Sequence, residues 1–104
     1  MDKLLKNGIV LNYDDIARLC EKYHVKELSI FGSSIRDDFT PKSDIDILVS
    51  FDPNAEITLF DIIELEAEFS LLLKRNVDIV EKESLKNPIR KNNILSTSKI
   101  IYAA

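Results

Sequence analysis

The sequence predicts a small α/β (α+β) fold in which helices pack on a mixed β-sheet. Two observations support this fold class. Segments with apolar residues at helical spacing alternate along the chain with short runs in which apolar and polar residues alternate. The chain has 104 residues, of which 45% are apolar and 31% are charged. A chain of this size and composition can bury a core without disulfides, so we expect one domain over residues 1–104.

The first half of the chain is predicted to contain a helix and two strands around a glycine turn. Asn12 can cap the helix. The apolar residues of that helix recur at helical spacing, at Ile16, Leu19, Cys20 and Tyr23. Residues 27–31 are predicted to form a strand that leads to Gly32. After it, residues 34–38 are predicted to add one or two helical turns, and residues 44–51 to form the next strand.

The longest predicted helix covers about residues 59–74 and begins after Thr58, which can act as its N-cap. Its apolar arc is expected to pack on the sheet and contains Leu59, Ile62, Ile63, Leu65, Phe69, Leu72 and Leu73. Outside this arc, Asp61, Glu64 and Glu68 line up as an acidic stripe. Such a stripe would suit a basic partner, and a merely solvated face is the alternative.

The C-terminal part is predicted to contain a strand, a short helix and an edge strand. Residues 77–80 alternate in the manner of a strand. Ser84 is the expected cap of the helix, which Pro88 would interrupt early and which would end near Leu95. Residues 99–102 could add a strand at the edge of the sheet.

Charge and cysteine content restrict the partners and the compartment. The net charge is −4 and the pI is near 4.9, which argues against a nucleic-acid substrate held by its phosphates. No apolar run approaches the roughly 18 residues that span a bilayer, so we expect no membrane association. Cys20 is the only cysteine, which excludes an intrachain disulfide and fits a reducing compartment. We therefore expect a cytoplasmic protein whose Cys20 packs in the core.

One motif points to chemistry: Gly32-Ser33, ten further residues, and then Asp44-Ile45-Asp46. A glycine backbone can approach a phosphate closely, and a following helix start and serine hydroxyl can bind the same anion. Asp44 and Asp46 would project from one strand face with Cα atoms about 7 Å apart, so both can reach divalent metal ions. The alternative is that they cap turns at strand ends. The spacing predicts nucleotidyl transfer.

A third carboxylate, Asp78, alternates against apolar neighbours in the strand of residues 77–80. Two Mg²⁺ ions about 4 Å apart can hold the attacking and leaving oxygens of such a transfer, and Asp44, Asp46 and Asp78 are suitable ligands. Asp78 could also accept the proton of the acceptor, and a solvated or salt-bridged strand residue is its alternative role. Arg36 could bind the phosphates or instead pair with an acid such as Asp37.

Residues 31–36 (FGSSIR) and 43–49 (SDIDILV) resemble the minimal nucleotidyltransferase (MNT) family of the DNA polymerase β superfamily. Residues 60–66 (FDIIELE) and 74–80 (KRNVDIV) resemble the same family, so the likeness covers most of residues 26–101. The resemblance implies the nucleotidyltransferase fold, with ATP as substrate and Mg²⁺ as cofactor.

Residue by residue, the resemblance implies that Gly32 and Ser33 bind the nucleotide. It implies that the catalytic, metal-binding carboxylates are Asp44, Asp46 and Asp78. Many relatives have Arg after the Gly-Ser pair and Gly after the second Arg, whereas this chain has Ser34 and Asp37. An acid at Asp37 would repel a triphosphate unless it turns outward or pairs with Arg36.

Members of the MNT family often act as antitoxins that pair with a HEPN-domain ribonuclease toxin, and some transfer AMP from ATP to a toxin tyrosine. The resemblance therefore implies an antitoxin that adenylylates a cognate HEPN toxin. Two alternatives stay open. The chain could neutralise the toxin by stoichiometric binding without catalysis, or it could modify a small hydroxylated molecule, for which a homo-oligomer could supply the missing wall of the site.

Overall fold

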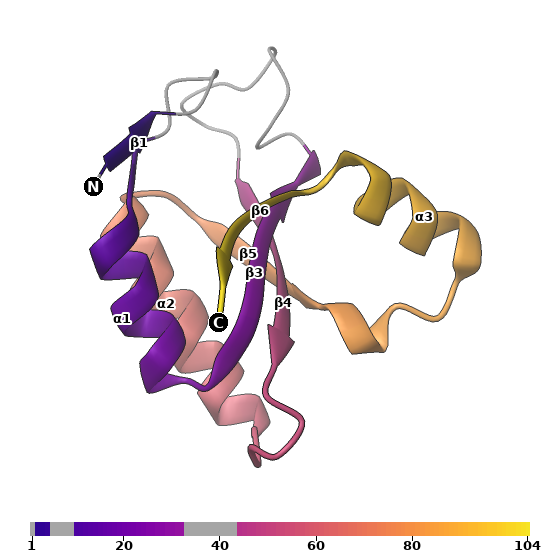
Figure 1. Ribbon diagram of the computed structural model, residues 1–104, viewed down its shortest axis with the longest axis horizontal. Coiled ribbons are helices and arrows are strands. Elements are labelled where there is room, and N and C mark those ends of the chain that lie inside the picture. The colour runs from indigo at the N-terminus through magenta and orange to yellow at the C-terminus, as the bar shows by residue number, and fades with distance from the viewer. Residues whose placement is uncertain (1, 5–9, 33–43) are drawn as a thin grey trace.

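A computed structural model describes residues 2–4, 10–32 and 44–104 (Figure 1). Its elements are, in chain order, β1 (Asp2–Leu4), β2 (Val10–Asn12), α1 (Tyr13–Lys22), β3 (Val25–Phe31), β4 (Ile45–Phe51), α2 (Leu59–Leu73), β5 (Val77–Glu81), the 3-10 turn η2 (Lys82–Ser84), α3 (Pro88–Thr97) and β6 (Lys99–Ala103).

Within the described residues, the main sheet has the strand order β5-β4-β3-β6. β3 is antiparallel to both β4 and β6, whereas β4 and β5 are parallel. The small mixed sheet and the C-terminal edge strand are thus confirmed. The short antiparallel pair β1-β2 was not predicted, because three-residue strands leave no periodic pattern in the sequence.

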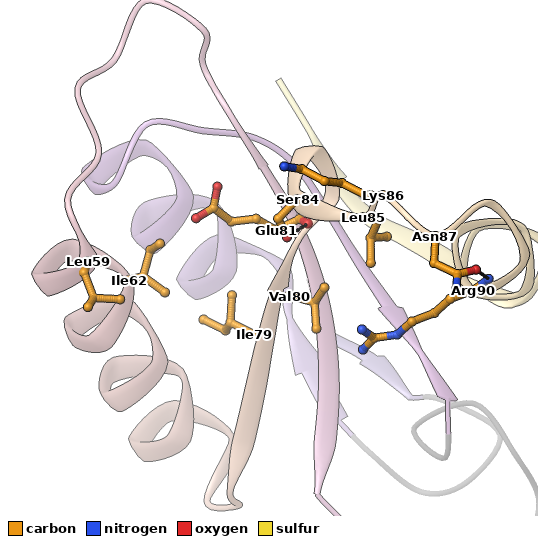
Figure 2. Close-up of a pocket in the computed structure, with 10 residues that line it drawn as sticks. All are labelled: Leu59, Ile62, Ile79, Val80, Glu81, Ser84, Leu85, Lys86, Asn87 and Arg90. Carbon is orange, nitrogen blue, oxygen red and sulfur yellow. Dashed lines mark hydrogen bonds between the residues drawn. The ribbon is translucent and has the colours of Figure 1, made fainter.

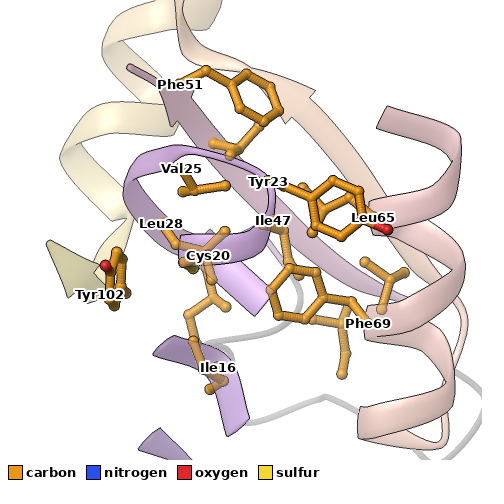
Figure 3. Close-up of a cluster of buried hydrophobic side chains, with 14 residues drawn as sticks. Ile16, Cys20, Tyr23, Val25, Leu28, Ile47, Phe51, Leu65, Phe69 and Tyr102 are labelled. Atoms are coloured by element: carbon orange, nitrogen blue, oxygen red, sulfur yellow. The ribbon is translucent and has the colours of Figure 1, made fainter. Parts of the chain in front are cut away.

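The main core lies between one face of the sheet and the helices α1 and α2 (Figure 1, Figure 3). β4 directs Ile45, Ile47 and Val49 to this face, and each is at most 1% exposed. From the helices, Ile16 and Phe69 are also 1% exposed. Burial of this apolar surface is the main favourable contribution to folding.

The opposite face of the sheet is covered only in part. A second, smaller buried cluster consists of Leu48 from β4, Leu85 from the segment before α3, and Ile94 from α3. Figure 1 shows α3 on the side of the sheet that α1 and α2 leave open. The prediction of helices on the sheet is confirmed, and α3 adds cover to the face on which the candidate site lies.

Side-chain caps fix where two helices begin. The Asn12 carboxamide oxygen accepts a hydrogen bond from the Asp15 amide at 3.0 Å, as predicted for α1. At the start of α2, the Thr58 hydroxyl accepts from the Asp61 amide while the Asp61 carboxylate accepts from the Thr58 amide. This reciprocal capping box matches the predicted helix start.

Two sequence-based expectations were wrong. Leu59 and Ile63 were placed in the buried arc of α2, but they are 71% and 56% exposed. The apolar part of this helix is wider than the face that the sheet covers. The last helix is capped by Asn87 rather than Ser84, and Pro88 begins it instead of interrupting it. Proline suits a first helical position because its missing N–H has no partner there.

No helix in the described part of the chain is long and apolar enough to cross a membrane.

Candidate active site

Asp46 and Asp78 lie side by side at one end of the sheet. They are register partners in the parallel pair of β4 and β5, whose backbones are about 4.8 Å apart. Because side chains alternate along a strand, Asp46 shares its face with Leu48, and Asp78 shares its face with Val80. Both carboxylates therefore occupy the face of the smaller cluster, where Asp46 is half-buried and Asp78 is exposed.

Gly32 brings the backbone of the glycine turn against the carboxylate of Asp46. β3 ends next to Asp46, because Phe31 is its register partner on the antiparallel strand. Gly32 has a φ of +64°, and a Cβ atom added to it would lie 2.5 Å from Oδ2 of Asp46. A side chain at this position would therefore collide with the carboxylate as well as strain the backbone. The two halves of the sequence motif meet in space at this contact.

Asp44 directly precedes β4 and is exposed. It stands two residues before Asp46, so an extended chain places it toward the same face. In the described part of the chain, no three His, Cys, Asp or Glu side chains lie close enough together to hold one metal ion. Of the three carboxylates predicted to meet, Asp46 and Asp78 are neighbours in the sheet, whereas Asp44 lies just before the start of β4.

This donor set fits Mg²⁺. The ion prefers hard oxygen ligands and is commonly held by one or two carboxylates together with substrate phosphates. Asp46 and Asp78 can supply such a pair, and the backbone of Gly32 lies directly against the carboxylate of Asp46. The chemistry of the residues present thus agrees with a magnesium-bound triphosphate.

The helical turns predicted over residues 34–38 lie outside the described residues, and so do four of the individual residues discussed from the sequence. They are Ser33 and Arg36, expected to bind phosphate, and the departures Ser34 and Asp37.

A hollow that the sequence did not indicate runs around the edge of β5 (Figure 2). Its volume is about 370 Å³, and it is lined on one side by Leu59 and Ile62 of α2. On the other side it is lined by Lys86 and by Arg90, whose guanidinium points from α3 back toward the sheet. It includes Val80, two residues beyond Asp78. No local pattern ties these residues together, because helix and loop positions far apart in sequence form the walls.

Cys20 takes no part in this region. It is fully buried in the main core (Figure 3), and burial raises the pKa of its thiol to about 12. A thiol with such a pKa stays protonated at neutral pH and is a poor nucleophile. The prediction that Cys20 packs in the core is confirmed.

The fold and the site define a small nucleotidyltransferase: a mixed sheet with paired strand carboxylates next to a glycine turn. A family model described as "Nucleotidyltransferase domain" matches residues 16–101, so the chain belongs to this family. This confirms the resemblance to the minimal nucleotidyltransferases.

Two relatives are similar over most of their length. A protein of Methanocaldococcus jannaschii, provisionally named a protein adenylyltransferase, is 47% identical over 76 residues, which are 73% of this chain and 76% of that protein. The protein adenylyltransferase MntA of Thermococcus cleftensis is 42% identical over 73 residues, which are 70% of this chain and 72% of MntA.

Solved structures support the fold. A toxin-antitoxin crystal structure with AMP-PNP superimposes with a TM-score of 0.71 at 22% identity, covering 90% of this chain and 75% of the other. A structure of the tri-AMPylated Shewanella oneidensis HEPN toxin in complex with MNT antitoxin gives a TM-score of 0.62 at 19% identity, covering 88% of this chain and 70% of the other. At these identities the likeness establishes the shared fold.

Proposed function

We propose that this chain is a magnesium-dependent antitoxin that transfers AMP from ATP to a tyrosine hydroxyl of a cognate HEPN-domain toxin. The observation that carries the proposal is the contact between Gly32 and Asp46 beside Asp78, which places the predicted phosphate-binding turn against the paired carboxylates. Relatives named as protein adenylyltransferases and the shared fold of toxin-antitoxin complexes support the choice of AMP and of a toxin. The acidic net charge favours a protein acceptor over a nucleic acid.

Each site residue has a proposed task. Asp44, Asp46 and Asp78 hold magnesium, which when bound neutralises the triphosphate and stabilises the leaving pyrophosphate. Gly32 and Ser33 bind the terminal phosphates through backbone N–H groups and a hydroxyl, and Arg36 adds a positive charge to them.

The transfer exchanges one phosphorus–oxygen bond for another. The acceptor oxygen bonds to the α-phosphorus of ATP, the bond from that phosphorus to the bridging oxygen breaks, and pyrophosphate leaves with the bonding electrons. Asp78 is exposed on the site face and accepts the proton of the acceptor hydroxyl. The sheet fixes the directions of Asp46 and Asp78 before substrate binds, which reduces the entropic cost of reaching the reactive arrangement.

The test is incorporation of label from α-labelled ATP into the purified cognate HEPN toxin in the presence of Mg²⁺, followed by the intact mass of the toxin. We expect mass increments of whole AMP groups and loss of labelling in Asp44→Asn/Asp46→Asn. The matched control is Asp52→Asn, at the other end of β4, where an asparagine can still accept the hydrogen bond from Asn54. Its labelling should equal that of the unaltered chain.

The same double variant separates catalysis from simple binding. If it still protects cells from the toxin in full while labelling is lost, neutralisation depends on contact and the chain is a stoichiometric antitoxin. If no nucleotide labels the toxin at all, the enzymatic proposal is wrong.

A further inference from the structure

α2 carries a row of exposed apolar side chains on its outer surface. Leu59, Ile63, Ala67 and Leu71 follow one another every fourth residue, so they lie in one row along the helix, and Phe60 lies beside this row. The exposed fractions are 71% for Leu59, 77% for Phe60, 56% for Ile63 and 80% for Leu71. We call these five residues the α2 stripe.

The fold of the domain itself does not use the α2 stripe. The helix packs on the sheet through another face, where Leu65 and Phe69 are at most 1% exposed. Single exposed apolar residues are common, but a contiguous row of large ones on a soluble domain marks an interaction surface. Its exposure to water is unfavourable, so a partner that covers it gains the free energy of that burial.

Carboxylates border the α2 stripe on both sides. Glu64 follows Phe60 by four residues, and Glu66 follows Ile63 by three, so the two acids lie on opposite borders of the row. Among the described residues, no hydrogen bond or ion pair joins Glu64 or Glu66 to another side chain. Every charged residue of α2 is acidic. The complementary surface is therefore apolar with Lys or Arg on its flanks.

A second copy of this chain fits poorly. In a two-fold symmetric pair of helices, each border of one stripe faces a border of the other, and since both borders are acidic, carboxylates of the two copies would meet. Such like-charge contacts disfavour association. A different protein with basic flanks avoids this repulsion.

One end of the stripe lies at the hollow around the edge of β5. Leu59 begins the stripe and lines the hollow around the edge of β5. The hollow continues to Val80, on the face that carries Asp78. A protein seated on the α2 stripe can thus extend a segment along the hollow toward the carboxylates.

We infer that the α2 stripe is the surface that binds the HEPN toxin, through an apolar patch of the toxin flanked by basic residues. The identity of this partner rests on the proposed function, whereas the chemistry of its surface follows from α2 alone.

The first test measures binding of the purified cognate HEPN toxin by calorimetry without ATP. The double variant Phe60→Gln/Leu71→Gln keeps good helix formers but removes the apolar surface, and we expect at least about tenfold weaker binding. Ile89→Gln is the matched control, because Ile89 is 73% exposed on α3, away from the stripe. Thermal unfolding of each variant reports whether the fold is kept.

The second test reverses the borders. The affinity of the unaltered chain for the toxin should decrease as the salt concentration rises. We expect Glu64→Lys/Glu66→Lys to weaken toxin binding by about tenfold and to remove this salt dependence. Glu21→Lys, an exposed acid at the end of α1, should keep the affinity and the salt dependence of the unaltered chain.

Unchanged affinity of folded stripe variants, or no binding by the unaltered chain, overturns the inference. The chain could instead form a dimer on its own that Phe60→Gln/Leu71→Gln dissociates. That result overturns the inference, because the stripe would then bind a second copy of the chain. If stripe variants bind the toxin with unchanged affinity and AMP transfer proceeds, the assignment of the α2 stripe as the toxin-binding surface is wrong and the proposed function stands. If they lose toxin binding but no chain labels the toxin, the surface stands and the enzymatic proposal fails.

Discussion

Gly32 is the residue at which conformation and site geometry depend on each other. Its left-handed φ of +64° alone does not require glycine, because His24 and Lys74 have φ values of 58° and 56°. Gly32 differs from them because a Cβ atom at this position would lie only 2.5 Å from Oδ2 of Asp46. The absence of a side chain is therefore needed for the carboxylate as much as for the backbone.

We expect Gly32→Ala to lose about 1–2 kcal/mol of unfolding free energy and nearly all AMP transfer, because the added methyl group displaces Asp46. Gly32→Asn separates the two causes. Asparagine tolerates a left-handed φ but still carries a Cβ atom, so it should recover part of the stability without recovering transfer. Urea unfolding and labelling of the toxin measure the two effects. Transfer by Gly32→Ala at the unaltered rate would contradict the proposed role of the close contact.

At the scale of elements, a polar contact joins the two helices that cover the main core. The Tyr23 hydroxyl, just after α1, donates a hydrogen bond to Oε2 of Glu68 on α2. Lys22 Nζ lies 3.1 Å from Oε1 of the same carboxylate. The hydrogen bond from Tyr23, followed by that from Lys22, lowers the pKa of Glu68, and the bond to Glu68 raises the pKa of Tyr23.

The signs of these shifts define a pH window of stability. The stabilisation from Glu68 is present above its ordinary pKa of 4.5 and is lost as the pH falls through its lowered folded value. The stabilisation from Tyr23 is present below its ordinary pKa of 10.0 and is lost as the pH rises through its raised folded value.

Tyr23→Phe should therefore lower stability by about 1 kcal/mol between these limits and flatten the pH dependence at both ends. Denaturant unfolding over a pH series measures this. Tyr13→Phe is the control, because the exposed Tyr13 ring contacts Tyr102 and its hydroxyl takes no part in the contact with Glu68. Equal pH profiles for Tyr23→Phe and the unaltered chain would contradict this role of the contact.

At the scale of the whole molecule, α2 has two apolar surfaces with different roles. Phe69 packs in the core that joins both helices to the sheet (Figure 3), whereas Leu71 on the same helix is exposed. We expect Phe69→Ala to cost about 3–5 kcal/mol of a total unfolding free energy of about 5–15 kcal/mol. Leu71→Ala, two residues away, should cost less than about 0.5 kcal/mol. Calorimetric unfolding compares the two, and a similar loss in both would mean that Leu71 is packed within the domain.

The sequence indicated most elements because they depend on local chemistry. Asn12 and Thr58 cap their helices as expected, and alternation along β4 separates the core residues from Asp46. Prediction was weaker at the start of α3, where the sequence offers two possible N-cap residues. Ser84 and Asn87 are both suitable caps, and the position of Pro88 after Asn87 decides between them.

By itself, the sequence determined the family, the candidate carboxylates and the segments that carry them, because motif spacing and periodicity are properties of neighbouring residues. Only the tertiary structure decided which groups meet. Strand register places Asp46 beside Asp78 and against Gly32, whereas Asp44 stays at the strand entrance. The tertiary structure also decided that Leu59 and Ile63 stay exposed to water, because the sheet covers only one face of the apolar helix α2.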